Sequence, residues 1–409
     1  IAQVAETVDT PRCTRIIGAQ DRYVIPGLVD PHVHIGGQVE GYYMLARAGV
    51  TTCLDMASYP GQMAKGMRSA NTGLTAGYLY PVIPGESVPG NDPSRACVKD
   101  VAAKAADAGA YGVKILGGHY PLTPAATRRV MEAAVARRLY CAVHAGTTEN
   151  GSDIKGLEEL LGLSGDLPIH VAHINAYCRG QVGGCPVEEA LKALRMLKRA
   201  PCIKCESYLA VINGCSAQIV NDTPQSDVTK TCLGRRGYAL TRAGMEQAIR
   251  DGWARIRGKT EEAFVLLPPE EGLAAFRRAR TRIGTSFAVN SPAAAVTLAS
   301  AKDEQGFFVI PAFGSDGGVI PRNTTLKQGL ALVTFGAFTM SDFIAKISSQ
   351  PAAMLGLSRK GHLGRGADAD VVVVKPDMSG PETVIARGEP VVEKDELLLN
   401  KACQHFPAL

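Results

Sequence analysis

The stretch VIPGLVDPHVH, residues 24–34, is an apolar run that ends in two histidines, His32 and His34. Because alternate side chains of a β-strand point to the same face, both imidazoles are aimed at one point. Two neutral imidazoles that converge at a strand end are typical ligands of a transition metal. The stretch therefore predicts a buried strand that ends at a metal site. A His-x-His pair alone is also compatible with two polar residues that leave a strand.

Strand-like and helix-like segments alternate along the rest of the chain. Asp92-Pro93, for example, has the acidic N-cap and the proline that favour the start of a helix. The expected later strands are residues 50–56, 74–83, 111–116, 139–145, 168–175, 203–210 and 307–313, and the expected helices are residues 42–48, 92–109, 123–138 and 186–199. This alternation predicts an α/β fold, a (β/α)8 TIM barrel rather than a sandwich.

Polar residues of the metal-binding or ionisable kind follow the expected strands at their carboxyl ends, where barrels of this type carry their sites. Lys114 stands alone in an apolar strand, where an unpaired ammonium is costly, although its chain could also reach the barrel rim. The set that shares this placement is, in chain order, His32, His34, Lys114, His144, His173 and Asp316. Six such residues in register with the strand count predict a metal-dependent enzyme.

This set, together with the PGLVDPHVH segment, resembles the amidohydrolase superfamily, in particular the binuclear hydantoinase, dihydropyrimidinase and dihydroorotase group. The resemblance covers about residues 20–390. It implies two divalent metal ions, zinc being expected, and a Lys114 that carbon dioxide converts to a bridging carbamate. The more buried metal would be held by His32, His34, Lys114 and Asp316. The second would be held by Lys114, His144 and His173.

The resemblance also implies a reaction, the hydrolysis of a C–N amide bond through a metal-bridging hydroxide. Asp316 would take the proton from that hydroxide and deliver it to the leaving nitrogen. A side chain in the Gly-Gly-His-Tyr loop, His119 or Tyr120, would hydrogen-bond the developing oxyanion, unless both are ordinary loop residues. His170 is expected on the opposite face of its strand from His173, as a packing or supporting residue.

Two segments favour a small cyclic amide or imide as the substrate. Asn290 lies where hydantoinases carry a substrate-binding Asn, and residues 206–209, ESYL, also resemble their pattern. Dihydroorotate is disfavoured, because residues 35–37 after the second histidine are Ile-Gly-Gly and lack the expected arginine.

Other features favour an open-chain substrate. Asp316 is followed by Gly317, with Arg322 downstream, and this resembles D-aminoacylases, which cleave N-acyl amino acids. Arg322 or Arg179 could bind a carboxylate with two hydrogen bonds, although both could also be ordinary rim arginines. The expected substrate-binding residues are thus His119, Tyr120, Asn290 and Arg322. Two rival classes are a scaffold that has lost its metals and a mononuclear deaminase. All six ligand positions are filled, and no His-x-x-Glu follows strand five.

The two ends of the chain predict a second, small domain. Residues 1–22 and 356–409 are expected to form a β-sandwich beside a barrel of residues 23–355, with N-terminal strand pieces at 1–4 and 15–17. We expect that further N-terminal strands are missing from this sequence. Residues 212–285 are an insertion without a match, and segments 240–257 and 270–282 are compatible with helices. The insertion is expected to form a lid or a subunit contact.

Composition narrows the class of protein further. The chain has 409 residues, 46% of them hydrophobic, which is enough for a large core. The net charge of +5 comes without a basic tract, so nucleic acid is not an expected partner. No apolar run reaches transmembrane length and no signal peptide is expected. The 11 cysteines do not resemble a disulfide framework. We expect a cytoplasmic homo-oligomer that acts on a small-molecule amide and uses no membrane.

Overall fold

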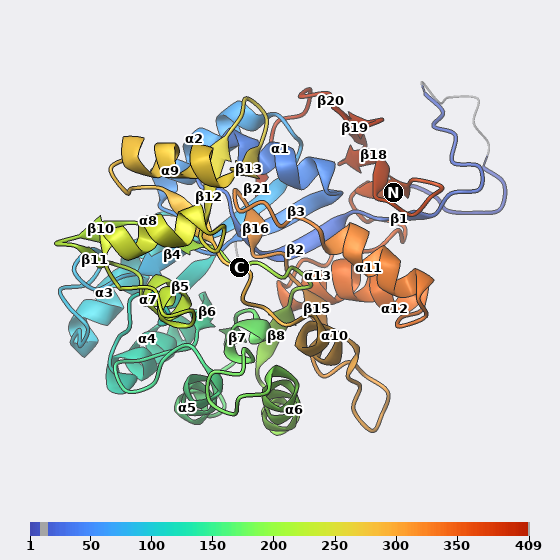
Figure 1. Cartoon of the computed structure of the whole chain (residues 1–409). Coiled ribbons are helices and arrows are strands. Elements are labelled where there is room, and N and C mark those ends of the chain that lie inside the picture. The colour runs from blue at the N-terminus through green and yellow to red at the C-terminus, as the bar shows by residue number, and fades with distance from the viewer. Residues whose placement is uncertain (9–14, 408–409) are drawn as a thin grey trace.

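The computed structural model describes residues 1–8 and 15–407, and its centre is a curled sheet of parallel strands (Figure 1). The strands are β2 (Leu28–His34), β3 (Val50–Asp55), β4 (Thr75–Val82), β5 (Gly112–Leu116), β6 (Tyr140–His144), β7 (His170–Val171), β8 (Lys204–Ser207), β15 (Ala312–Phe313) and β16 (Gly317–Gly318). They pair in the order β15-β8-β7-β6-β5-β4-β3-β2-β16. The expected (β/α)8 barrel is confirmed.

The last barrel segment closes the sheet on itself. Strand β15 pairs with β8, and β16, only a short turn later, pairs with β2 on the other side. The backbone N–H of Asp316, within that turn, donates to the carbonyl of His32 at 2.8 Å. The expected eighth strand at 307–313 is thus present only as its last two residues. The turn that follows it brings Asp316 beside the first strand.

Helices surround the barrel. They are α1 (Val39–Arg47), α2 (Pro60–Ala70), α3 (Arg95–Asp107), α4 (Pro124–Ala136), α5 (Ile154–Ser164), α6 (Pro186–Leu197), α10 (Pro292–Ser300), α11 (Thr325–Thr334), α12 (Met340–Ile344) and α13 (Gln350–Met354), with η1 (Ile174–Tyr177) after β7 and η2 (Ala345–Ser349) after α12. The start expected at Asp92 lies two residues early, because Ser94 caps α3 through the Cys97 N–H. Asp92 instead accepts a hydrogen bond from Thr123, the N-cap of α4.

The insertion at 212–285 folds around a hydrophobic cluster of its own, which includes Trp253, Phe276 and Phe287. Its elements are β9 (Cys215–Ser216), β10 (Ile219–Val220), β11 (Thr223–Pro224), α7 (Asp227–Gly234), α8 (Arg242–Arg250), β12 (Arg255–Lys259), β13 (Phe264–Leu266), α9 (Pro269–Arg278) and β14 (Gly284–Ser286). Strands β13, β12, β14 and β9 form an antiparallel sheet. The helix expected through 257 was wrong beyond Arg250, because the chain turns at Gly252 and then pairs as β12.

The terminal segments form one antiparallel sheet beside the barrel. Its strands are β1 (Val24–Pro26), β17 (Val371–Val374), β18 (Pro381–Ala386), β19 (Glu389–Glu393) and β20 (Glu396–Leu397), in that order. Valines of this sheet, such as Val372 and Val384, belong to the same hydrophobic cluster as the barrel strands. The domain boundaries stay a prediction.

The strand pieces expected at 1–4 and 15–17 were wrong. Neither stretch pairs with a strand in the described residues, and the apolar side chains of Val4 and Ile16 are exposed. A strand without a partner leaves its backbone groups unpaired, which explains why these stretches stay irregular. At the other end, β21 (Gln404–His405) pairs with the barrel strand β4 instead of with the terminal sheet. No helix of the described chain is long and apolar enough to cross a membrane.

Candidate metal centre

The six residues expected as metal ligands lie together at the carboxyl ends of the barrel strands. They line a cavity of about 440 Å³. Its lining comprises His32, His34, Lys114, Leu116, His119, His144, His173, Ala176, Arg179, Tyr208, Asn213, Gly214, Val228 and Asp316. Neighbouring parallel strands bring their ends to one rim, so residues almost 300 positions apart in the chain meet there.

His32, His34 and Asp316 form the tightest group. Nε2 of His34 lies 3.0 Å from Oδ1 of Asp316, and Nε2 of His32 lies 3.3 Å from the same oxygen. One ligand atom from each residue falls within 4.8 Å of the others. Two imidazoles and a carboxylate are a fitting donor set for a divalent transition metal.

His144 and His173 lie on the other side of the same cavity. The two rings are 4.5 Å apart at their centroids, and His173 stacks on His32 at 4.9 Å. Nδ1 of His173 is buried without a hydrogen-bond partner in the described chain. Nε2 of His144 contacts the Ser152 hydroxyl at 2.7 Å, which leaves Nδ1 as the ring nitrogen available to bind a metal. Both rings therefore have the free nitrogen that a metal ligand requires.

Lys114 is buried between these two groups without a carboxylate in ion-pair distance among the described residues. Its Nζ donates a hydrogen bond to the Met56 sulfur at 3.5 Å. Burial lowers the pKa of Lys114 to about 8, although Glu206 and Asp316 act in the opposite direction. The neutral amine, which is the form that reacts with carbon dioxide, is thus more accessible here than for an ordinary lysine.

Glu206 on β8 organises the ligands from behind. Its carboxylate accepts from His32 Nδ1 at 2.7 Å and from the backbone N–H of His173 at 2.7 Å, and it also contacts His170 Nε2. Burial alone would raise the pKa of Glu206, but His170 and His32 lower it well below its usual value. The bond to Nδ1 leaves Nε2 of His32 as the ligand atom. The sequence analysis treated Glu206 only as part of a substrate pattern, although a lone acid in a buried strand was a signal for this role.

Asp30 is a second supporting residue that the sequence analysis did not single out. Its Oδ1 accepts from the backbone N–H groups of His32 and Ser315, each at 3.1 Å. Burial raises the pKa of Asp30 to about 7, while the bonds from Ser315 and His32 lower it. Asp30 therefore ties the first strand to the turn that carries Asp316.

Two candidate ligands have backbone angles that non-glycine residues rarely adopt. The φ of His173 is 35° and that of Asp316 is 49°. Such angles persist where surrounding contacts hold them, and they cluster at functional sites. Here the holding contacts are the Glu206 bond to the His173 N–H and the His32 carbonyl that accepts from the Asp316 N–H.

Of the two expected oxyanion-binding residues, only one lies at the cavity. His119 lines the cavity, and its Nδ1 contacts the hydroxyl of Ser226, which belongs to the insertion, at 3.0 Å. Tyr120 is partly exposed and is not part of the cavity lining. Of the two, only His119 lines the cavity, and its contact with the oxyanion stays a prediction.

The side-chain amide of Asn290 is fully engaged within the protein. Its Oδ1 accepts from Arg179 Nε at 2.9 Å and from the Tyr208 hydroxyl at 3.2 Å. Its Nδ2 donates to the carbonyls of Ala210 and Ile212. An asparagine amide has two acceptor sites and two donors, so all of its capacity is used within the protein. The Asn290 side chain therefore supports its surroundings, and the expected contact of Asn290 with substrate stays a prediction.

Arg322 is neither a rim arginine nor an open carboxylate site. It is 2% exposed and pairs with the Asp316 carboxylate, while its Nε donates to the Asp316 carbonyl at 2.6 Å. Its Nη1 donates to the Ile212 carbonyl at 2.9 Å. Burial would raise the pKa of Asp316, but Arg322 and His32 lower it well below its usual value. Arg322 therefore holds Asp316 ionised, and its expected role in substrate binding stays a prediction.

Comparison with known proteins agrees with this geometry. Residues 289–395 match the model of the amidohydrolase family. A dihydroorotase of Pelobacter propionicus is 41% identical over 61 residues, which cover 15% of this chain and 14% of that protein. The match therefore spans a small part of that relative's length.

Solved structures are similar over nearly the whole chain. A D-aminoacylase described as having a binuclear metal centre shares 16% identity at a TM-score of 0.69, over 99% of this chain and 93% of its own. A D-hydantoinase shares 16% identity at a TM-score of 0.58, over 99% of this chain and 92% of its own. At this identity the likeness shows the fold. Together with the family match, it confirms the resemblance to the amidohydrolase superfamily.

The bond between Glu206 and His32 leads to a prediction about metal affinity. Glu206→Gln should weaken zinc binding by about 10- to 100-fold, because an amide no longer fixes the charge and tautomer of the imidazoles. The measurement is zinc titration by competition with a chromogenic chelator. Glu40→Gln is the matched control, since Glu40 is also buried but pairs with Lys259 away from the cavity. An unchanged zinc affinity in Glu206→Gln would contradict the assignment.

Proposed function

We propose that this protein is a metal-dependent hydrolase that cleaves a C–N amide bond in a small molecule. The single observation that carries the proposal is the gathering of four histidines, Lys114 and Asp316 around one cavity at the barrel rim. His32, His34, Lys114 and Asp316 would hold one divalent ion, and Lys114, His144 and His173 would hold the other. Zinc suits these nitrogen and oxygen donors. A scaffold that has lost its metals is disfavoured, because all six positions carry a residue that can bind a metal, Lys114 as its carbamate.

Bound metal ions would polarise the amide carbonyl and lower the pKa of the attacking water. Asp316 is positioned to act as the proton carrier. Its carboxylate faces His32 and His34, and Arg322 keeps it ionised, which is the form that can accept a proton. It then returns the proton to the leaving nitrogen, which departs as a neutral amine or amide.

His119 supports the oxyanion in this proposal. Burial lowers the pKa of His119 to about 4, so its ring is neutral near pH 7. When Nδ1 accepts from the Ser226 hydroxyl, Nε2 carries the ring proton and can donate to the oxygen of the former carbonyl. The insertion thereby orients a group of the barrel site.

The substrate proposal becomes broader than the sequence suggested. The cyclic amide was favoured by Asn290 and by the segment that contains Glu206, and both side chains are engaged within the protein. We therefore propose hydrolysis of a small amide, with cyclic amides and N-acyl amino acids as the two classes to compare.

The direct test is metal analysis combined with a substrate screen. The zinc-loaded chain should contain about two ions and should hydrolyse at least one hydantoin, dihydropyrimidine, cyclic imide or N-acyl amino acid. Ring opening adds water without releasing a second product, whereas deacylation releases an amine, so product analysis separates the two classes. A chelator-treated sample is the control. Two bound ions without hydrolysis of any of these amides would contradict the proposed function.

The role of Asp316 predicts a large loss of turnover. Asp316→Asn should reduce kcat by about 10²- to 10⁴-fold, because the amide cannot carry the proton. Metal content is measured in the same sample, so that loss of an ion is distinguished from loss of proton transfer. Asp107→Asn, at the exposed end of α3, is the control and should retain normal turnover. Near-normal turnover in Asp316→Asn would remove this residue from the mechanism.

The environment of Lys114 predicts a carbamate. Wild-type protein supplied with ¹³C-bicarbonate and zinc should show a carbamate carbon signal by NMR, and Lys114→Ala should lack it. The variant should also lose metal and activity, because no anion replaces the carbamate between the cations. Short carboxylic acids such as propionate should restore part of both. Wild-type protein with two bound ions and no carbamate signal would show that the idea is wrong.

A further inference from the structure

Arg179 is a buried cation that the proposed mechanism does not use. It follows η1, is 7% exposed, and donates from Nε to Asn290 Oδ1 at 2.9 Å and from Nη2 to the Tyr208 hydroxyl at 3.3 Å. Both partners are uncharged. No carboxylate pairs with Arg179 in the part of the chain that the structure describes. A buried guanidinium without an opposite charge is costly, so its retention calls for an anion from outside the protein.

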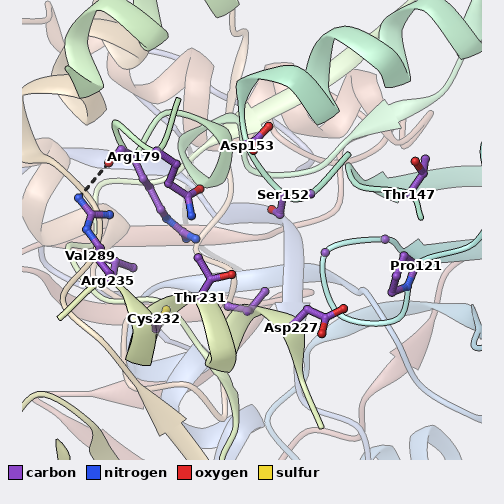
Figure 2. Close-up of a pocket in the computed structure, with 15 residues that line it drawn as sticks. Pro121, Thr147, Ser152, Asp153, Arg179, Asp227, Thr231, Cys232, Arg235 and Val289 are labelled. Atoms are coloured by element: carbon purple, nitrogen blue, oxygen red, sulfur yellow. Dashed lines mark hydrogen bonds between the residues drawn. The ribbon is translucent and has the colours of Figure 1, made fainter. Parts of the chain in front are cut away.

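The position of Arg179 joins the metal cavity to a larger one. Arg179 lines the cavity of the six candidate ligands and also an adjoining cavity of about 640 Å³. Figure 2 shows its side chain extending into this second cavity, with Ser152 and Asp153 on one side and Thr231 and Cys232 on the other. A group bound to Arg179 would therefore be part of a molecule that also reaches the metal cavity.

The acidic residues around Arg179 have other partners. Asp153 caps α5 by accepting from the N–H groups of Lys155 and Gly156. Asp227 pairs with Lys230 at 2.6 Å, and Asp316 pairs with Arg322. Arg179 therefore remains the buried positive charge between the two cavities that lacks a counter-charge from the described residues.

The segment that carries Arg179 is held from two sides. Glu189 of α6 accepts from the backbone N–H groups of Gly180 and Val182, at 2.6 and 2.9 Å. Arg235 of the insertion donates to the Arg179 carbonyl at 2.9 Å, a bond drawn in Figure 2. A guanidinium that is fixed before binding loses little freedom when a ligand arrives, which favours binding.

We infer that Arg179 binds a carboxylate of the substrate, so that the substrate is an amide that also carries a carboxylate. Nε and Nη2 are occupied, but Nη1 has no hydrogen bond from the described chain, and Nη2 retains a second N–H. These N–H groups can bind a carboxylate with two hydrogen bonds, a geometry that lysine does not provide. The inference rests on the proposed function for the reaction, but it makes a claim of its own about binding.

The test compares substrates that differ in one charge. The zinc-loaded full chain is assayed with N-acetylated D- and L-amino acids and their uncharged primary amides, and with dihydrouracil and its 6-carboxylate. The carboxylate member of the cleaved class should have the lower KM. Arg179→Gln should raise KM for that member by about 10- to 100-fold, because a charged hydrogen-bond pair is lost, with a smaller change in kcat. Arg278→Gln, an exposed arginine of the insertion, is the control.

A second variant and a binding measurement keep the inference falsifiable if Arg179→Gln folds poorly. Arg179→Lys retains the charge without the planar fork and should show an intermediate KM. Calorimetric titration of the zinc-loaded Asp316→Asn chain with N-acetylalanine and with N-acetylalaninamide measures binding with turnover suppressed. This chain should bind only N-acetylalanine strongly. If amides are hydrolysed but charged and neutral members bind and react alike, the inference is wrong and the proposed function stands. If no amide is cleaved, the proposed function fails and the titration alone decides about Arg179. Loss of N-acetylalanine binding in the Arg179 variants then supports the inference. Equal binding of N-acetylalanine and N-acetylalaninamide, or no binding of either, overturns it.

Discussion

The buried carboxylate of Glu206 is the interaction on which the candidate metal centre depends. One carboxylate contacts the His32 ring, the His170 ring and the backbone N–H of His173, so it connects three strands beneath the cavity. A buried acid is stable only when such partners compensate for the loss of water. The same contacts select the tautomer of His32 and hold His173 at a backbone angle that it would otherwise avoid.

Charge compensation also determines how the turn with Ser315 and Asp316 is held beside the first barrel strand. Asp30 joins the backbone of His32 to that of Ser315, and Arg322 pairs with Oδ2 of Asp316 while His32 and His34 face Oδ1. Both contacts lie at the turn where the barrel closes, and they place a carboxylate beside the first two histidines. Arg179 lacks this compensation from the described residues, which is the contrast that sets it apart as a binding group.

The insertion contributes to the site although it folds around its own hydrophobic cluster. Ser226 contacts the His119 ring, Arg235 holds the segment of Arg179, and Val228 lines both cavities. The barrel therefore supplies the candidate ligands, and the insertion covers them and shapes the adjoining space. A division of this kind allows substrate preference to change through the insertion while the ligand set remains.

The sequence by itself determined the barrel and the six residues at its rim, because strand periodicity and the placement of His32, His34, Lys114, His144, His173 and Asp316 are local properties. The local sequence could not show which of the surrounding polar side chains are hydrogen-bonded within the protein. Asn290, Arg322 and Glu206 carry the right groups for binding substrate, yet they are occupied by Ala210, Ile212 and His32, which are distant from them in sequence. The irregular N-terminal stretches and strand β12 depended likewise on which strands were available for pairing. Only the tertiary structure decided which polar groups remain free, because hydrogen-bond capacity is shared among residues that meet through folding.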